Sequence, residues 1–318
     1  MFFPPSHKDV RKSLRLPPQC SWLKINGSWP LSKQKCDGFY SRHTLLQMAY
    51  TVWAWYVIAS VGVTICYQTG FLMTHLSDII MTTENCCTTF MGALNFIRLI
   101  HLRLNQTKFR NLIGSFYHDI WIPNITDPII FADCQKRMRT FVIMTALLLC
   151  LIILYCVMPL IELFFNLGLD SHIKPFPYKM VFPYDPYCSL MVYVITYMFT
   201  SYAGICVVTT LFAEDSVFGF FITYTCCQFQ LLHEKIRCLF MEEIELTAND
   251  QNEWQIYYKR LESIVEKHNK IIRFSKKLED FFNPILLFNL IISSILICMV
   301  GFQIITVDFD PMWITDMD

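Results

Sequence analysis

The stretch "SKKLEDFFNPILLFNL", residues 275–290, changes character halfway, from lysines and acids to an apolar run that continues to about Thr306. An apolar run of about 20 residues is long enough to cross a hydrocarbon core about 30 Å thick as a helix. The sequence therefore predicts a membrane span that begins near Phe281. The orientation of that span depends on which side of the membrane the lysines occupy.

The composition indicates an all-α integral membrane protein. The chain has 318 residues, of which 54% are hydrophobic and 16% charged, and its mean hydropathy is +0.39. A soluble domain carries roughly 25% charged residues. Here long uncharged runs alternate with charged ones, which is typical of a protein that contacts a lipid bilayer. The formal net charge is zero, so the total charge suggests no nucleic-acid partner.

Five apolar segments are predicted to span the membrane, at residues 44–67, 70–97, 140–165, 189–213 and 281–306. The second is the weakest, because it carries Asp78 and Glu84. A further uncharged run, residues 216–232, follows "FAEDSV", which offers no Gly or Pro for a turn between two spans. We therefore expect one helix over about 189–240 that leaves the bilayer near Glu214 and opens a cytosolic helical region over about 214–280.

The cytosolic region contains a predicted amphipathic helix. Apolar residues recur there at a spacing of three and four, which is typical of one helical face. We expect this face to pack on the extension of the fourth span, with the membrane surface as the alternative. Its members are Trp254, Tyr258, Leu261, Val265, His268, Ile272 and Ser275.

The basic residues orient the chain. Of the 26 Lys and Arg, eight precede the first span, seven lie over residues 98–139 and nine lie between the fourth and fifth spans. Only Lys174 and Lys179 lie on the opposite side. Because Lys and Arg are in excess on the cytoplasmic side of a membrane, we expect a cytoplasmic N-terminus. The Asn-x-Ser/Thr sequons at Asn26, Asn105 and Asn124 are a counter-signal, since all three fall on the predicted cytoplasmic side.

The sequence lacks four common catalytic or ligand-binding motifs. There is no CxxC, HExxH, GxGxxG or GxxxxGK[ST] pattern, so we expect no enzyme activity, no metal and no cofactor. Cys188 lies at the end of the third predicted connection, directly before the fourth span. Either it remains a free thiol, or it forms a disulfide with a cysteine near the same membrane face, such as Cys66.

Three stretches carry a family resemblance. They are "PFPYKMVFPYDPY" (175–187), "YVITYMFTSYAG" (193–204) and "HNKIIRFSKKLEDFFNPILLFNLIISSILICMVGF" (268–302). Together they resemble insect odorant receptors. Members of that family have seven helices and a cytoplasmic N-terminus, and the cytoplasmic N-terminus agrees with the orientation argued above. The similarity extends over nearly the whole chain, and it implies that residues 1–318 form a single transmembrane domain of this kind. The motifs are loose, because they consist of proline, aromatic and apolar classes at a spacing.

The resemblance implies a receptor for volatile small molecules in the plasma membrane of olfactory sensory neurons. It implies a hetero-oligomer with a co-receptor subunit that gates a cation channel. The chain lacks the enlarged cytoplasmic insertion of the co-receptor and is similar to an odour-tuning subunit. Family members continue through a sixth and a seventh helix, so we expect this chain to be truncated at its C-terminus. The alternatives are a gustatory receptor, a G-protein-coupled receptor, which requires an outside N-terminus, and a small-solute transporter.

In this family the resemblance places the ligand pocket in the outer half of the helix bundle. Polar groups within a bilayer face protein or water rather than lipid, so polar faces of the spans are candidates for its walls. The alternatives are interhelical hydrogen bonding, a structural kink at the proline, and interfacial anchoring of the tyrosines. The nine candidate ligand-binding residues are Asp78, Thr82, Asn85, Tyr155, Pro159, Glu162, Tyr193, Tyr197 and Thr200.

The connection 167–188 alternates prolines with aromatic residues. Prolines stiffen the backbone, and the aromatic side chains give the loop apolar surface to bury. We expect it to form a lid over the outer end of the bundle, with anchoring at the bilayer surface as the alternative.

Overall fold

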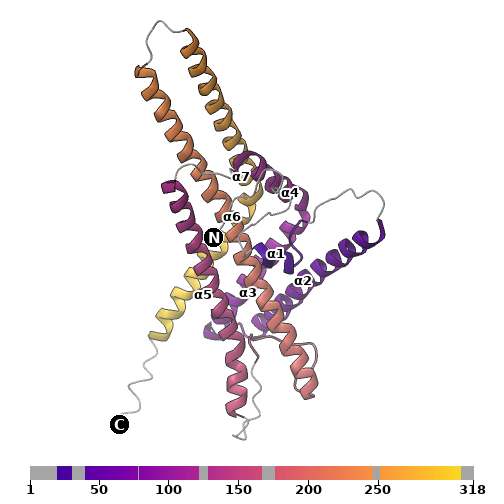
Figure 1. Ribbon diagram of the computed structural model, residues 1–318. Coiled ribbons are helices and arrows are strands. Elements are labelled where there is room, and N and C mark those ends of the chain that lie inside the picture. The colour runs from indigo at the N-terminus through magenta and orange to yellow at the C-terminus, as the bar shows by residue number, and fades with distance from the viewer. Residues whose placement is uncertain are drawn as a thin grey trace. The chain divides into compact units, whose positions relative to one another are not determined.

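The computed structural model describes residues 20–30, 40–77, 79–121, 128–166, 176–245 and 251–308 (Figure 1). Within these ranges every regular element is a helix, which confirms the predicted all-α class. The helices are α1 (Cys20–Ile25), α2 (Tyr40–Thr74), α3 (Ile79–Leu104), α4 (Gln106–Ser115), the π-helix η1 (Phe116–Ile120), α5 (Pro128–Asn166), α6 (Leu190–Glu245) and α7 (Gln251–Asp308).

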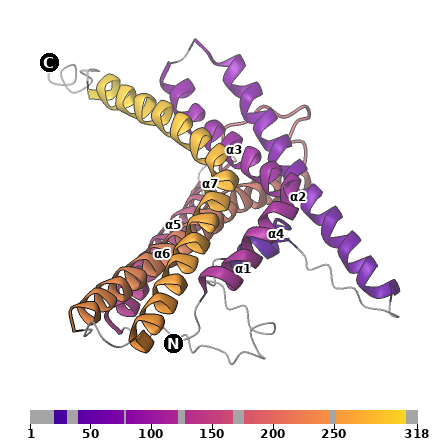
Figure 2. The same ribbon diagram turned by 90° about the horizontal axis from the view of Figure 1, so that it is seen from above.

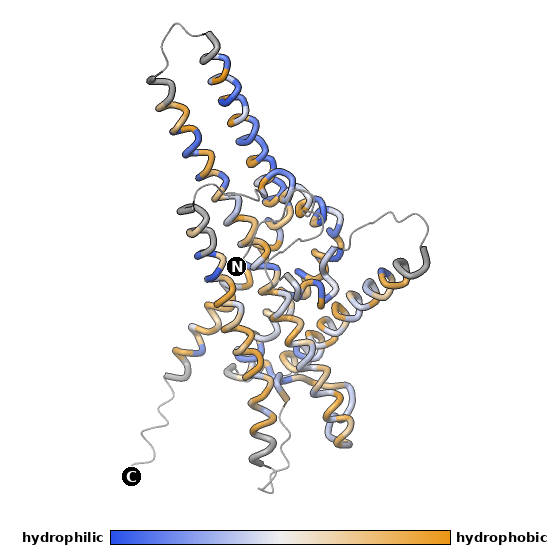
Figure 3. Tube along the Cα trace, viewed as in Figure 1, coloured by the Kyte–Doolittle hydropathy of each residue, from blue (hydrophilic) through white to orange (hydrophobic). Residues whose placement is uncertain are grey.

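Four of these helices contain segments long and apolar enough to cross a membrane: Leu45–Thr74, Lys136–Ile161, Leu190–Met241 and Trp254–Ile305. Apolar residues cover long stretches of each of them (Figure 3). The helix over the second predicted span, α3, is not among them, because threonine, asparagine and charged side chains lower its hydropathy. Several of these, including Asn85, Thr89 and Arg98, are buried inside the protein. The chain is an integral membrane protein whose α3 faces protein more than lipid.

Helix boundaries differ from the predicted spans at two places. The turn between the first and second predicted spans lies at residues 76–77 and not at residues 68–69, because α2 continues to Thr74. Pro284 lies inside α7 without ending it, so the amphipathic segment and the fifth span form one helix of 58 residues. The single long helix expected after residue 189 is confirmed, since α6 has 56 residues, which is about 84 Å at 1.5 Å per residue.

The chain forms two compact units. The first, here called the aromatic unit, comprises Met1–Ser21, Asn105–Thr145 and Ala213–Asn283. The second, here called the cavity unit, comprises Trp22–Leu104, Ala146–Phe212 and Pro284–Asp318. Both α6 and α7 contribute to each unit. Their division points fall close to the predicted ends of the fourth and fifth membrane spans.

The aromatic unit is built on Phe116 of η1, which is fully buried. Its ring centroid lies 4.9 Å from that of Phe221, 5.2 Å from that of Phe220 and 5.8 Å from that of Phe274. Within this unit α6 and α7 run side by side (Figures 1 and 2). Burial of this many aromatic rings stabilises the packing of η1 on both long helices.

The predicted apolar face of the amphipathic segment is shifted from the real one. Tyr258, Val265 and Ile272 are exposed, at 61%, 51% and 46% of their surface. The residues that are buried are Tyr257, Ile271, Phe274 and Leu278. Two neighbouring faces of this helical segment carry aromatic and apolar side chains at a helical spacing. The sequence alone therefore does not decide which face is buried, and packing against the rest of the aromatic unit decides it.

The cavity unit includes a short N-terminal segment that packs on α2 and α6. Asn26 is 4% exposed, and its Nδ2 donates hydrogen bonds to the hydroxyl oxygens of Thr209 at 3.0 Å and Thr210 at 2.7 Å. Gly27 has φ +76°, and a Cβ there would lie 2.7 Å from the Cα of Ala54. Only glycine combines this backbone conformation with so close an approach. Helices α2 and α3 also pack on each other in this unit (Figure 2).

Candidate ligand-binding cavity

The cavity unit contains a cavity of about 350 Å³ between α2, α3, α5, α6 and one loop residue, Tyr178. This volume lies within the usual range for small-molecule sites, about 300–1,000 Å³. The lining consists of Val61, Thr64, Ile65, Gln68, Cys87, Thr88, Met91, Gly92, Leu148, Leu151, Ile152, Tyr155, Tyr178, Gly204, Val207, Val208 and Phe212.

The lining contains no Asp, Glu, Lys, Arg or His. The two lining threonines donate their hydroxyl hydrogens within their own helices. Thr64 Oγ1 donates to the carbonyl of Ser60 at 2.9 Å, and Thr88 Oγ1 donates to the carbonyl of Asn85 at 3.0 Å. Each hydroxyl oxygen keeps acceptor capacity after such a bond. The further polar groups of the lining are the Gln68 amide, the Cys87 thiol and the hydroxyls of Tyr155 and Tyr178. A charged ligand would therefore lose its hydration without gaining a counter-charge from these walls.

The described part of the connection between α5 and α6, residues 176–189, is tied to α2 and α3. The backbone N–H of Val181 donates to the carbonyl of Tyr67 at 3.2 Å. Beside it the ring of Phe182 lies edge-on to that of Tyr67, with centroids 5.5 Å apart. Lys179 Nζ pairs with Glu84 Oε2 of α3 at 2.6 Å. These contacts place the loop against the helices that line the cavity.

A second set of loop contacts is aromatic and reaches α6. The ring of Phe176 lies 5.1 Å from that of Tyr193 and 6.5 Å from that of Tyr197, centroid to centroid. The hydroxyl of Tyr184 is 2.8 Å from that of Thr196. The loop thus packs the half-buried Phe176, Tyr178 and Phe182 against protein, whereas Tyr184 and Tyr187 are 45% and 50% exposed. The packed residues fit the predicted lid, and the two exposed tyrosines fit the alternative, an anchor at the bilayer surface.

Tyr178 is the loop residue that lines the cavity. Its ring stacks at a tilt on that of Tyr155 from α5, with centroids 5.5 Å apart. Burial, more than the neighbouring Cys156 and tyrosines, raises the pKa of the Tyr178 hydroxyl far above its ordinary value. The hydroxyl is therefore a neutral hydrogen-bond donor at physiological pH.

Of the candidate residues that the structure describes, only Tyr155 lies in the cavity wall. Thr82 and Asn85 serve helix packing, since Thr82 Oγ1 donates to the carbonyl of His75 at 2.8 Å and Asn85 Nδ2 to that of Gln68 at 3.1 Å. Asn85 thereby holds α3 against α2 beside the cavity. Asp78 lies outside the described residues, and so does the side chain of Glu162. Pro159 is half-buried within α5 and does not line the cavity.

The three candidates on α6 are buried but lie outside the lining. Tyr193 is 2% exposed, Tyr197 5% and Thr200 1%. Tyr197 donates its hydroxyl hydrogen to the carbonyl of Cys156, and Thr200 Oγ1 donates to the carbonyl of Tyr197 at 3.0 Å. Both tyrosines also belong to the aromatic contacts of the loop. The two tyrosines are therefore neither interfacial anchors nor walls of this cavity. They form the surface of α6 against which Phe176 of the loop packs.

Sixteen of the 17 lining residues were absent from the candidates, and Tyr178 and Gly204 are two of the sixteen. The sequence signals of these two were the proline–aromatic alternation of the loop and the glycine one turn after Thr200 on α6. Cys66 and Cys188, considered above as a disulfide pair, are both free thiols.

Comparison with known proteins identifies the family to which this chain belongs. A sequence model described as "7tm Odorant receptor" matches residues 78–315. The chain belongs to the odorant receptor family. It is 63% identical over 295 residues to Odorant receptor 13a of Drosophila melanogaster, covering 93% of this chain and 69% of that receptor. Odorant receptor 22c of the same organism is 25% identical over 306 residues, 88% of this chain and 69% of that receptor.

Solved structures agree on the fold of this odorant receptor chain. The olfactory receptor OR5 of Machilis hrabei in complex with eugenol superposes with a TM-score of 0.69 at 16% identity, covering 93% of this chain and 71% of that one. The structure of the same receptor described without eugenol gives a TM-score of 0.63 at 14% identity. The resemblance read from the sequence is therefore confirmed, and with it the class of protein: a membrane receptor of the odorant receptor family.

Proposed function

We propose that this receptor binds a neutral, mainly apolar odorant in the cavity between α2, α3, α5 and α6. The observation that carries the proposal is the cavity itself. It is about 350 Å³ in volume, has no charged residue in its lining and includes the hydroxyl-bearing side chain of Tyr178 in that lining. The related receptor OR5 was solved with eugenol, a ligand of the same chemical class.

The polar groups of the lining define the chemistry of the ligand further. Tyr155 and Tyr178 supply hydroxyl donors, while Thr64, Thr88 and Gln68 supply oxygen acceptors beside mostly aliphatic walls. A compact molecule with one oxygen function, such as a ketone, ester, ether or phenol, matches this lining. Charged ligands such as amino acids or amines do not.

The proposal extends to signalling. As an odour-tuning subunit, the receptor would join a co-receptor in a hetero-oligomer and, on binding the odorant, gate a cation channel in the plasma membrane of olfactory sensory neurons. Support for this comes from membership of the family and from the 63% identity to Odorant receptor 13a.

The test is to fill the cavity. Val208→Trp adds an indole ring to a residue of the lining, whereas Val194→Trp makes the same change on the same helix at a residue that is 48% exposed and outside the lining. Each variant is expressed with the co-receptor, both as the 318-residue chain and extended with the remaining residues of Odorant receptor 13a. Odour-evoked current and surface expression are measured together.

We expect Val208→Trp to lower the response to every agonist at least about tenfold, which corresponds to about 1.4 kcal/mol of binding free energy. We expect Val194→Trp to respond like the parent. Retention of normal dose–response curves by a surface-expressed Val208→Trp receptor would show that odorants bind elsewhere.

We further propose that the N-terminus is cytoplasmic, as the distribution of Lys and Arg indicates. The structure removes part of the counter-signal from the sequons, because Asn26 is buried and bonded to Thr209 and Thr210, which leaves no room for a glycan. An epitope tag at residue 1 should stain only after cells are permeabilised. Staining of intact cells would reverse the topology.

A further inference from the structure

The ring of Tyr178 lies directly on the bare backbone of Gly204 in α6. A Cβ placed on Gly204 would lie 2.0 Å from the hydroxyl oxygen of Tyr178 and 2.8 Å from its Cζ. Real side chains do not approach that closely, so glycine is the residue that leaves room for this ring. By contrast, a Cβ on Gly301 of α7 would have no atom within 4 Å.

The loop backbone on the C-terminal side of Tyr178 is held in place. Val181 is bonded to the Tyr67 carbonyl, and Lys179 is paired with Glu84. On the other side, Phe176 packs on Tyr193 and Phe182. Because the residues on both sides of Tyr178 are in contact with the helices, its backbone has little freedom to move. A side chain added at Gly204 would therefore displace mainly the Tyr178 side chain, and the cavity is the open space beside it.

We propose that Tyr178 and Gly204 together set the size limit of the odorant, with Tyr178 as an end wall of the cavity and Gly204 as its seat. This inference rests on the proposed function of the cavity. Removing the ring lengthens the space available to the ligand. A methyl group on Gly204 drives the ring off its seat into the cavity and shortens that space.

The proposal is tested with a homologous series of straight-chain 2-alkanones, which carry one oxygen acceptor and differ only in length. The measured quantity is the longest member that evokes a current in the receptor expressed with its co-receptor. Tyr178→Ala should extend this limit by about two to four methylene groups, because truncating a half-buried aromatic residue that lines the cavity enlarges that cavity. Tyr178→Leu keeps some of the volume and should extend it less.

Two further variants separate the ring from its hydroxyl and from its seat. Tyr178→Phe keeps the ring, so the size limit should stay where it is even if sensitivity to ketones falls. Gly204→Ala should shorten the limit in the parent but leave it unchanged in the Tyr178→Ala background. Gly301→Ala is the control for adding a methyl group to a helical glycine.

An unchanged size limit in both surface-expressed Tyr178→Ala and Tyr178→Leu receptors would overturn the inference. An equal effect of Gly204→Ala with and without the Tyr178 ring would overturn it too, since the seat would then act independently. The proposed function has its own readout. If Val208→Trp abolishes the responses while the Tyr178 variants leave the limit unchanged, the cavity binds odorants and only this inference is wrong.

Discussion

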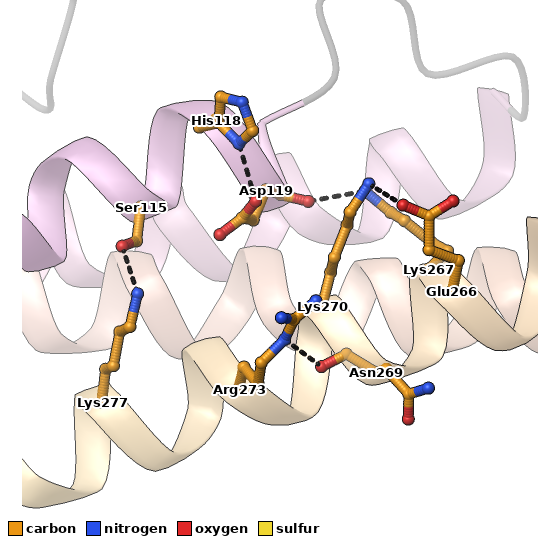
Figure 4. Close-up of polar contacts among 9 residues, drawn as sticks. All are labelled: Ser115, His118, Asp119, Glu266, Lys267, Asn269, Lys270, Arg273 and Lys277. Carbon is orange, nitrogen blue, oxygen red and sulfur yellow. Dashed lines mark hydrogen bonds and ion pairs between the residues drawn. The ribbon is translucent and has the colours of Figure 1, made fainter.

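Two lysines donate hydrogen bonds of the same length in very different settings. In the cavity unit, Lys179 Nζ lies 2.6 Å from Glu84 Oε2, where the two side chains are 41% and 57% exposed. In the aromatic unit, Lys267 Nζ of α7 lies 2.6 Å from the carbonyl oxygen of Asp119 at the end of η1, and both residues are half-buried (Figure 4). A second lysine of α7, Lys277, donates to Ser115 Oγ at 2.8 Å in the same region.

The comparison shows that the donor–acceptor distance alone does not determine how much each contact contributes to stability. An exposed ion pair gains little, because water and salt screen both charges and two long side chains lose freedom. A lysine at the C-terminal end of a helix meets carbonyl groups that lack partners within the helix and carry its negative dipole end. We therefore expect the aromatic unit to depend on its buried contacts and the loop over the cavity to be held more weakly.

The largest expected effect is at the centre of the aromatic unit. Phe116→Ala should destabilise the protein by about 3–5 kcal/mol, because it removes a fully buried ring packed against several others. Phe240→Ala is the control, since Phe240 is 55% exposed on α6. The measurement is the apparent Tm of the purified receptor in detergent, with surface expression alongside. A Tm loss no larger than that of the control would mean that the unit does not depend on its aromatic core.

The features that could be predicted from the sequence differ between the two long helices. The long α6 was predictable, because "FAEDSV" contains no residue that turns a chain and the following run is polar for lipid. The covered face of α7 was not, since Tyr257 and Tyr258 both fit a helical period, and the structure buries Tyr257 and leaves Tyr258 exposed.

The cavity shows the same limit. Tyr193 and Tyr197 read equally well as anchors or walls, and what decides their role is Phe176, which arrives from the preceding loop. The contact between Tyr178 and Gly204 joins a loop residue to a helix residue that comes 26 positions later (204 − 178 = 26), a separation over which no periodicity carries information. Helix positions were thus readable from local pattern, whereas the walls of the site depend on how loop and helices meet.

An intermediate effect is expected at Lys267. Lys267→Met keeps most of the aliphatic stem and removes the donor to the Asp119 carbonyl, which should cost about 1–2 kcal/mol of stability. The matched control is Lys259→Met, which changes an exposed lysine of the same helix. Hydrogen exchange of the η1 amides, read by mass spectrometry, should accelerate in Lys267→Met and not in the control. Equal protection in both would show that packing of Phe116 alone holds η1 on α7.

The smallest expected effect is at the exposed ion pair. Lys179→Met and Glu84→Gln should each change stability by about 0–1 kcal/mol, because both partners of the pair are solvated. Since 1 kcal/mol is roughly a fivefold change in an equilibrium constant, the half-maximal odorant concentration should shift by less than about fivefold. The loop keeps its other ties in these variants, namely the bond from Val181 to Tyr67 and the packing of Phe176. The measurement is a full dose–response curve at low and at physiological ionic strength, where the small difference between parent and variant should shrink as salt screens the pair. A loss of sensitivity greater than tenfold in both variants would contradict the comparison. It would mean that the pair, although exposed, governs the position of Tyr178 and hence of the cavity wall.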